Sequence, residues 1–199
     1  MTPWLPLIGL SLYLLAVLAT PTIGLAVVHG RQGLVLHRAR STAERALGLG
    51  FLLLIGGLVA WTILLGLWGP TALGVWALPD PARLLGWALL LGGTLLTAAA
   101  QWQMGASWRV GIDHDPTELV TCGLFRWMRN PIFTGMMLSL AGFTALCPAP
   151  LTVFMLLATV VLLPVQVRLE ERHLLAQHGE AWAGYAARTG RFLPGLGRR

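Results

Sequence analysis

Five apolar stretches, separated by polar segments, divide the chain. They cover residues 3–28, 46–68, 83–104, 131–147 and 149–167. The first three clearly exceed the roughly 18 residues that a helix needs to cross a bilayer. The last two, at 17 and 19 residues, are shorter and are joined by a tight turn at 147–150. The pattern predicts an all-α integral membrane bundle of about five transmembrane helices. Pro21 lies in the second half of the first stretch, so we expect a kink or tilt there.

The carboxyl-terminal tail, 168–199, is polar and helical in composition. Its first part should continue the last apolar stretch into the cytosol and end at Gly179, a residue typical of helix ends. A second short helix is predicted over 180–188, with Trp182 and Tyr185 three residues apart on one face. We expect this face to pack back against the membrane-proximal segments and to close a site there.

Composition places the chain in the membrane class. Hydrophobic residues make up 56% of it and charged residues 11%, and a soluble domain of this length does not contain so much continuous apolar sequence. The first apolar stretch lacks a basic leader and a small-residue cleavage site, so we expect it to remain as a helix. We predict one membrane domain over 1–199, with three spans in 1–104 and the catalytic half in 105–199.

The basic residues predict the orientation in the membrane. The net charge is +6, and all 14 basic residues are arginines. Most of them fall on one side of the predicted topology: Arg31, Arg38, Arg40, Arg45, Arg109, Arg126, Arg129, Arg168, Arg172, Arg188, Arg191, Arg198 and Arg199. The other side has Arg83, beside Asp80. By the positive-inside rule the amino terminus lies outside and the carboxyl terminus in the cytoplasm, and we expect the inner membrane of a prokaryote.

The positive charge does not indicate nucleic acid, because no basic patch is interleaved with aromatic residues on a soluble module. Anionic lipid headgroups are the expected partner. No obligate protein partner is evident. No pair of glycines four residues apart occurs in any apolar stretch, so the sequence has no simple signal for helix dimerisation.

The segment 119–131 is the first candidate for a site. Arg126, Arg129 and the pair Asn130-Pro131 lie directly at the start of an apolar stretch. Positive charges and backbone groups without hydrogen bonds are energetically costly at a membrane boundary unless they bind a charged ligand. The positive-inside rule alone would explain the arginines, but Pro131 opens a helix and should leave backbone groups available at the corner.

A second candidate is the pair Glu170-Glu171, where the last apolar stretch leaves the membrane. One interpretation is a solvated helix segment that balances Arg168 and Arg172. The other is a carboxylate that accepts hydrogen bonds from a ribose or lies near a cationic ligand. Spacing alone does not separate the two.

Three other patterns carry less weight. The residues 113–115, Asp-His-Asp, are adjacent in sequence without helical spacing, so a solvated loop is favoured over a metal site and no metal is predicted. Cys122 has no histidine in its own segment to activate it, which favours an inert side chain. Gly48 and Gly50 lack a third glycine and lie inside an apolar stretch, which excludes a soluble-type dinucleotide domain.

Taken together, several motifs resemble the isoprenylcysteine carboxyl methyltransferase family, a branch of a wider group that includes membrane phospholipid methyltransferases. The resemblance runs in order from about residue 100 to 194. It is carried by the segment 104–113, the segment from Leu119 through Arg129-Asn130-Pro131, the pair Glu170-Glu171, and Gly179-Glu180 followed by Tyr185.

The resemblance implies S-adenosylmethionine as methyl donor, held between membrane helices and the cytosolic tail. The cofactor contacts that it implies are Thr117, Glu118, Leu119, Val120, Phe125, Arg129, Asn130, Pro131, Ile132, Glu170 and Glu171. A site that mixes arginine, glutamate and free backbone suits a ligand with a sulfonium, an ammonium and a carboxylate.

The methyl acceptor implied by the resemblance is a lipophilic molecule or a lipid that enters sideways from the bilayer. We expect Arg109, Gln166 and Arg168 to orient it. Gln166 stands where eukaryotic members carry an arginine that faces the substrate carboxylate, which leaves a carboxylate, an amine and a thiol all open. A carboxylate needs no base, whereas an amine or thiol needs one, and His173, Glu171 and His114 are the candidates.

Two other functions remain as hypotheses. Membrane sterol reductases have a similar helical scaffold and bind NADPH, but they need a longer chain and more polar residues for the second nucleotide half. In a non-enzymatic membrane scaffold, the segment 126–131 would serve only to set the orientation in the membrane. The clustering of Glu170, Arg129 and Asn130 argues against this hypothesis.

Overall fold

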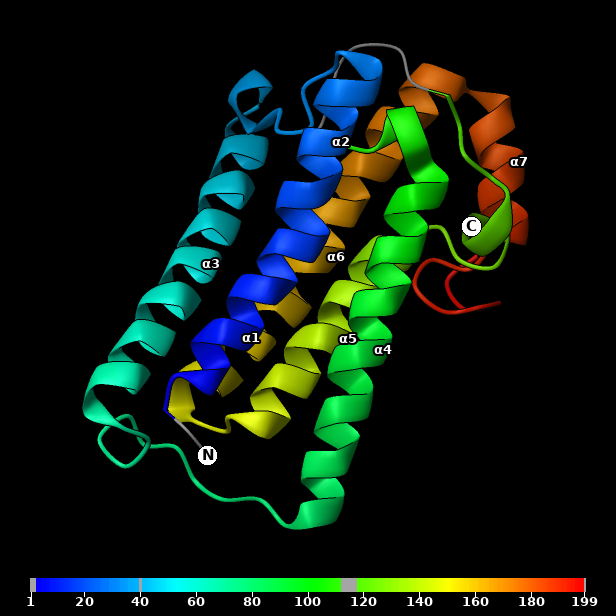
Figure 1. Ribbon diagram of the computed structural model, residues 1–199. Coiled ribbons are helices and arrows are strands. Elements are labelled where there is room, and N and C mark those ends of the chain that lie inside the picture. The colour runs from blue at the N-terminus through cyan, green and yellow to red at the C-terminus, as the bar shows by residue number, and fades with distance from the viewer. Residues whose placement is uncertain (1–2, 40, 112–117, 199) are drawn as a thin grey trace.

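The computed structural model describes residues 3–39, 41–111 and 118–198, and these residues form a helical bundle (Figure 1). Within them the regular elements are all helices, and the short elements η1 to η4 are one π-helical turn followed by three 3₁₀ turns. In chain order the elements are α1 (Leu5–Leu14), η1 (Leu15–Ala19), α2 (Thr20–His29), η2 (Leu36–Arg38), α3 (Thr42–Trp68), α4 (Asp80–Met104), η3 (Gly105–Ser107), η4 (Gly123–Arg126), α5 (Pro131–Leu146), α6 (Pro150–His178) and α7 (Glu180–Arg188).

Four helical segments are long and apolar enough to cross a bilayer: Leu5–His29, Thr42–Trp68, Asp80–Ser107 and Pro150–His178. They correspond to four of the five predicted spans. The remaining one, α5, has 16 residues, a length of about 24 Å at 1.5 Å per residue, which is less than the roughly 30 Å hydrocarbon core. The helical tail is confirmed: α6 ends before Gly179, and α7 begins directly after it.

The first span is irregular, which agrees with the kink or tilt expected from Pro21. A π-helical turn, η1, separates α1 from α2, and Pro21 lies in the first turn of α2. Proline has no N–H to donate four residues back, so a helix that contains it must rearrange its hydrogen bonds nearby. The rearrangement here is the wider turn over Leu15–Ala19.

The helices α4 and α5 pack side by side over their length (Figure 1). Each carries two glycines seven residues apart: Gly86 and Gly93 on α4, Gly135 and Gly142 on α5. A Cβ atom on Gly93 would lie 2.5 Å from the carbonyl oxygen of Gly135, and one on Gly142 would lie 2.6 Å from that of Gly86. Small residues let the two backbones approach closely. In a membrane the hydrophobic effect does not drive helices together, so van der Waals contacts of this kind stabilise their association.

We expect Gly142→Ala to destabilise the protein by about 1–3 kcal/mol, the usual cost of overpacking a tight interface. The new Cβ would meet backbone atoms of Leu90 and Gly86, which cannot rotate away. The matched control is Gly92→Ala on α4, since Gly92 is exposed and a Cβ there would meet nothing within 4 Å. Thermal unfolding of both purified variants in detergent measures the difference, and equal melting temperatures would contradict close α4–α5 packing.

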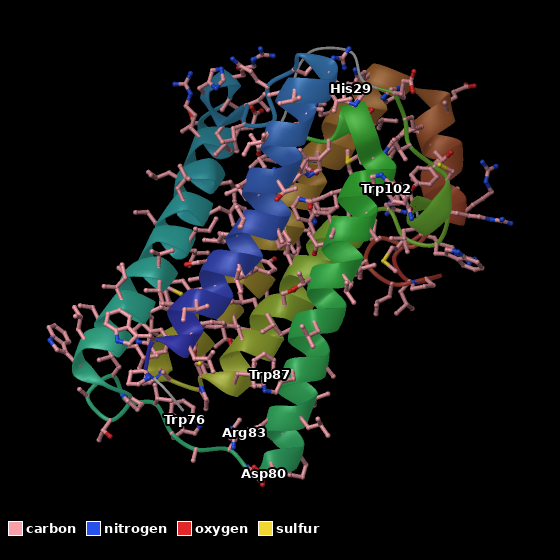
Figure 2. The ribbon with its side chains drawn as sticks, in the orientation of Figure 1. His29, Trp76, Asp80, Arg83, Trp87 and Trp102 are labelled. Atoms are coloured by element: carbon pink, nitrogen blue, oxygen red, sulfur yellow. The ribbon has the colours of Figure 1, made fainter. Side chains whose placement is uncertain are left out.

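The two ends of the bundle differ in chemistry (Figure 2). At one end lie Trp76, Trp87 and the exposed pair Asp80 and Arg83, whose side chains are 3.3 Å apart. At that end the core is apolar, with Leu65, Trp61, Phe143, Cys147 and Met155 among its buried residues. The opposite end carries the tail, η4 and the loop after α2 (Figure 1). The structure therefore leaves one end of the bundle for a polar site.

Candidate active site

A cavity of about 350 Å³ lies inside the bundle and reaches its polar end. Twelve of the residues predicted for the site line it: Arg109, Glu118, Leu119, Val120, Phe125, Arg129, Asn130, Pro131, Ile132, Gln166, Glu170 and Glu171. Thr117 lies outside the described residues, as do the segment 113–115 and His114. Arg168 is exposed and is not among the lining residues. Segments far apart in sequence thus meet around one cavity.

Glu170 lies on α6 and faces this cavity. The side-chain nitrogen Nε2 of Gln166, one helical turn earlier, donates to its Oε1 at 2.8 Å. Among the described residues this is the hydrogen bond that Glu170 makes, so its carboxylate retains acceptor capacity toward the cavity. Gln166 thereby orients Glu170, whereas Arg168, two residues before Glu170, points to another side of the helix.

Arg129 also lines the cavity, but its guanidinium group is bound by the protein itself. Its Nε and Nη2 donate to Oε1 of Glu171 at 3.2 and 3.0 Å. Its Nη1 donates to the carbonyl oxygens of Ala186 and Thr189, and Nη2 also donates to that of Gly197 at 2.9 Å. A guanidinium has five N–H donors, and these five contacts match that number.

Glu171 is buried between two arginines. Arg191 donates from Nε to its Oε1 at 3.0 Å and from Nη2 to its Oε2 at 2.8 Å. Together with Arg129 this makes a three-residue ion cluster whose acid is 3% exposed. Sequence reasoning assigned Arg191 only to the charged tail. No local spacing reveals it, because Arg191 lies 20 residues from Glu171 and reaches it through the turn after α7.

The tail segment 190–197, which we call the strap, binds the start of α5. The backbone N–H groups of Arg129 and Asn130 donate to the carbonyl oxygens of Gly190 and Arg191, at 2.8 and 3.1 Å. The side-chain amide of Asn130 donates to the same Arg191 oxygen at 3.0 Å. The strap therefore occupies two of the backbone donors at this corner, those of Arg129 and Asn130, the residues directly before α5.

The helix α7 closes the cavity from the polar side. Trp182 and Tyr185 are buried against Leu119 and Leu174, which confirms that this face packs back on the site. The hydroxyl of Tyr185 donates to the carbonyl oxygen of Phe125 at 2.6 Å. Burial raises the pKa of Tyr185 to about 12, so the phenol keeps its proton and its hydrogen bond at neutral pH.

The amino-terminal half supplies the facing wall, which sequence reasoning did not place in the site. The loop after α2 forms a short β-like bridge to the chain after η3: Val35 N–H donates to the oxygen of Val110 at 3.0 Å, and Val110 N–H to that of Gly33 at 2.8 Å. Trp108 lies so close to Gly33 that a Cβ there would meet the indole at 2.8 Å. This contact leaves room only for glycine.

Deeper in the bundle the cavity wall becomes apolar. Its residues there come from α1, η1, α3 and α5, and include Leu14, Val17, Leu18, Phe51, Leu52, Ile55, Phe133 and Met136. Leu52 is 54% exposed and Ile55 37% exposed on the lipid-facing surface of α3. One cavity therefore joins a polar mouth around Glu170 to an apolar interior near the bilayer.

Comparison with known proteins identifies the class of this bundle. The family model for phospholipid methyltransferase matches residues 81–181. A solved structure of the eukaryotic intramembrane Ras methyltransferase, isoprenylcysteine carboxyl methyltransferase, has a similar fold, with a TM-score of 0.57 and 17% sequence identity over 96% of this chain and 74% of that one. No curated protein sequence gave a significant match.

The family match covers half of the chain and includes η4, the start of α5 and the Glu170-Glu171 pair. The fold likeness extends over nearly all of it, including the amino-terminal helices that the family model does not reach. The resemblance inferred from the sequence motifs agrees with both. The chain belongs to the phospholipid methyltransferase family and is an integral membrane methyltransferase.

Proposed function

We propose that this protein transfers a methyl group from S-adenosylmethionine to a lipophilic acceptor at the cytoplasmic side of the membrane. The observation that carries the proposal is the single cavity that joins the Glu170 carboxylate to an apolar interior. A charged, water-soluble donor and a membrane-soluble acceptor need two chemically different compartments in contact. The polar mouth and the apolar interior of this cavity are two such compartments.

The polar half fits the donor by its chemistry. Glu170 keeps acceptor capacity, and a carboxylate can receive hydrogen bonds from ribose hydroxyls or from an ammonium group. Leu119, Phe125 and Trp182 add apolar and aromatic surface to the same wall, which suits a purine and a sulfonium. Arg109 also lines this cavity and could orient the acceptor or the donor's carboxylate.

S-adenosylmethionine, when bound, supplies a methyl group already activated by a sulfonium. The chain therefore needs to align two ligands and exclude water, and good alignment can contribute up to about 7–11 kcal/mol of barrier lowering in well-oriented reactions. The buried face of α7 and the loop bridge at Val35–Val110 shield the cavity from solvent. Both oxygens of Glu171 receive arginine donors, which makes Glu171 a poor general base for an amine or thiol acceptor.

The direct test supplies radiolabelled S-adenosylmethionine to membranes that contain the full chain and extracts the lipids. We expect label in an organic-soluble product and none in membranes that lack the protein. Binding is measured in parallel on the purified protein with S-adenosylmethionine and with NADPH. Tight binding of NADPH without binding of S-adenosylmethionine would replace the proposal with a reductase.

We infer further that the polar end of the bundle faces the cytoplasm of a prokaryotic cell. Cys122 lies at that end beside η4 and is exposed, whereas Cys147 follows α5 at the other end and is buried. A membrane-impermeant maleimide should therefore label inside-out vesicles and spare right-side-out vesicles. Cys122→Ser should abolish the labelling, and labelling of right-side-out vesicles would invert the topology.

A further inference from the structure

A buried glutamine on α4 makes an unusual contact with the first span. Gln101 is 7% exposed, and its Nε2 donates to the carbonyl oxygen of Val17 at 2.7 Å. Val17 lies in the π-helical turn η1. In a regular helix the N–H four residues later would serve that oxygen, but that residue is Pro21, which has none. Gln101 thus replaces the donor that Pro21 lacks.

This contact fixes which way the amide of Gln101 points. A carbonyl oxygen accepts only from the NH₂ end of a side-chain amide, so the nitrogen faces Val17. The oxygen and nitrogen of an amide point in different directions from the carbon that they share, and Oε1 is therefore turned away from Val17. Gln101 itself lines the cavity, and among the described residues its Oε1 accepts no hydrogen bond.

The position of this oxygen favours the acceptor over the donor molecule. Gln101 packs against η1, which belongs to the apolar part of the wall together with Leu14 and Leu18. Glu170 and the segment 118–120 belong to the polar mouth. An acceptor atom in a largely apolar wall favours ligands that can donate to it over ligands that cannot, because an unmet polar contact is costly in such surroundings.

The geometry points to Gln101 as a specificity-determining residue whose Oε1 accepts a hydrogen bond from an N–H or O–H group on the lipophilic methyl acceptor. This inference rests on the proposed function for the identity of the ligand. Pro21 acts through Gln101: by leaving the Val17 oxygen without its helical donor, it holds the amide in the orientation that presents oxygen to the cavity. Pro21 is in this sense a positioning residue.

Two long-chain ammonium probes, one with N–H donors and one with a bulkier headgroup that has none, test the inference on the full chain in nanodiscs. Dodecylamine and dodecyltrimethylammonium have the same chain and the same charge, but only dodecylamine has N–H donors. Equilibrium dialysis with radiolabelled probes, against empty nanodiscs, should show dodecylamine bound about five- to tenfold more tightly, as one hydrogen bond allows. Gln101→Met should remove this preference and leave the affinity for S-adenosylmethionine within about twofold.

A second variant separates the role of the oxygen from the role of the Val17 contact. Combining Gln101→Met with Pro21→Ala restores a backbone N–H to the first span, and with it thermal stability, but returns no oxygen to the cavity. We expect the double variant to be stable and still to lack the preference. Equal binding of the probes by the wild type, no binding of dodecylamine, or a preference that survives in either variant would overturn the inference.

The proposed function can fail independently of this result. Absence of S-adenosylmethionine binding and of lipid labelling by the wild-type protein would remove the methyl-donor assignment. A donor-selective probe preference that depends on Gln101 could still be observed in that case, and it would then describe the ligand of another reaction.

Discussion

Glu170→Ala is expected to weaken the binding of S-adenosylmethionine by one to two orders of magnitude. Hydrogen bonds to a charged group contribute about 1.5–3 kcal/mol, and Glu170 is a cavity carboxylate that retains acceptor capacity. Isothermal titration of the purified protein measures the loss. The melting temperature should stay close to that of the wild type, because Glu170 takes no part in the buried ion cluster of Arg129, Glu171 and Arg191.

Two neighbours on α6 serve as controls for this variant. Gln166→Leu removes the amide that orients Glu170 at 2.8 Å, so we expect a smaller loss in the same direction. Arg168→Ala should leave cofactor binding unchanged, because Arg168 is exposed and does not line the cavity. Wild-type affinity in Glu170→Ala, or a large loss in Arg168→Ala, would show that the donor does not bind against this face of α6.

Arg129→Ala should destabilise the protein by about 3–5 kcal/mol, the usual cost of removing one partner from a buried ion pair. The variant removes one of the two arginines that bind Glu171, and with it the donor to the carbonyl oxygens of Ala186 and Gly197. We therefore expect the strap to detach before the bundle unfolds. A lower melting temperature and faster trypsin cleavage at Arg191 report the two effects.

The matched control for this variant is Arg126→Ala. Arg126 is exposed and lies 5.9 Å from the ring centre of the exposed Trp127, a contact that contributes only about 0.5–1 kcal/mol at such a site. Arg129→Lys should fall between the two, because an ammonium has three donors in place of five. A strap that remains resistant to trypsin in Arg129→Ala would show that other contacts hold it.

The functional consequence of the ion cluster differs from the role that the sequence motif implied for Arg129. The resemblance placed Arg129 and Glu171 among the cofactor contacts, and both do line the cavity. Their polar atoms, however, bind each other, Arg191 and the strap. Whether they also contact the donor stays a prediction; their role in holding the strap against the start of α5 follows from the hydrogen bonds themselves.

The sequence pattern also did not predict other tertiary contacts. The apolar stretches contain no pair of glycines four residues apart, whereas Gly86 and Gly93 on α4 meet Gly135 and Gly142 on α5 with a spacing of seven. A seven-residue interval places two residues on the same side of a helix. Only the antiparallel pairing of α4 and α5 reveals that both sets face each other within one chain.

The sequence by itself determined the helices, the polar end of the bundle and the candidate Glu170. These properties depend on residues close in the chain: an apolar run long enough to cross lipid must satisfy its backbone as a helix, and glycine at position 179 ends α6 and separates it from α7.

Only the tertiary structure decided which polar atoms remain available to a ligand. Arg129 reaches Glu171 across 42 residues, and Gln101 reaches Val17 across 84. Both arginine and glutamine can serve many partners, and the partner is chosen by the packing of segments that local patterns do not relate. In this bundle the packing binds the arginine into the strap and turns one amide oxygen toward the cavity.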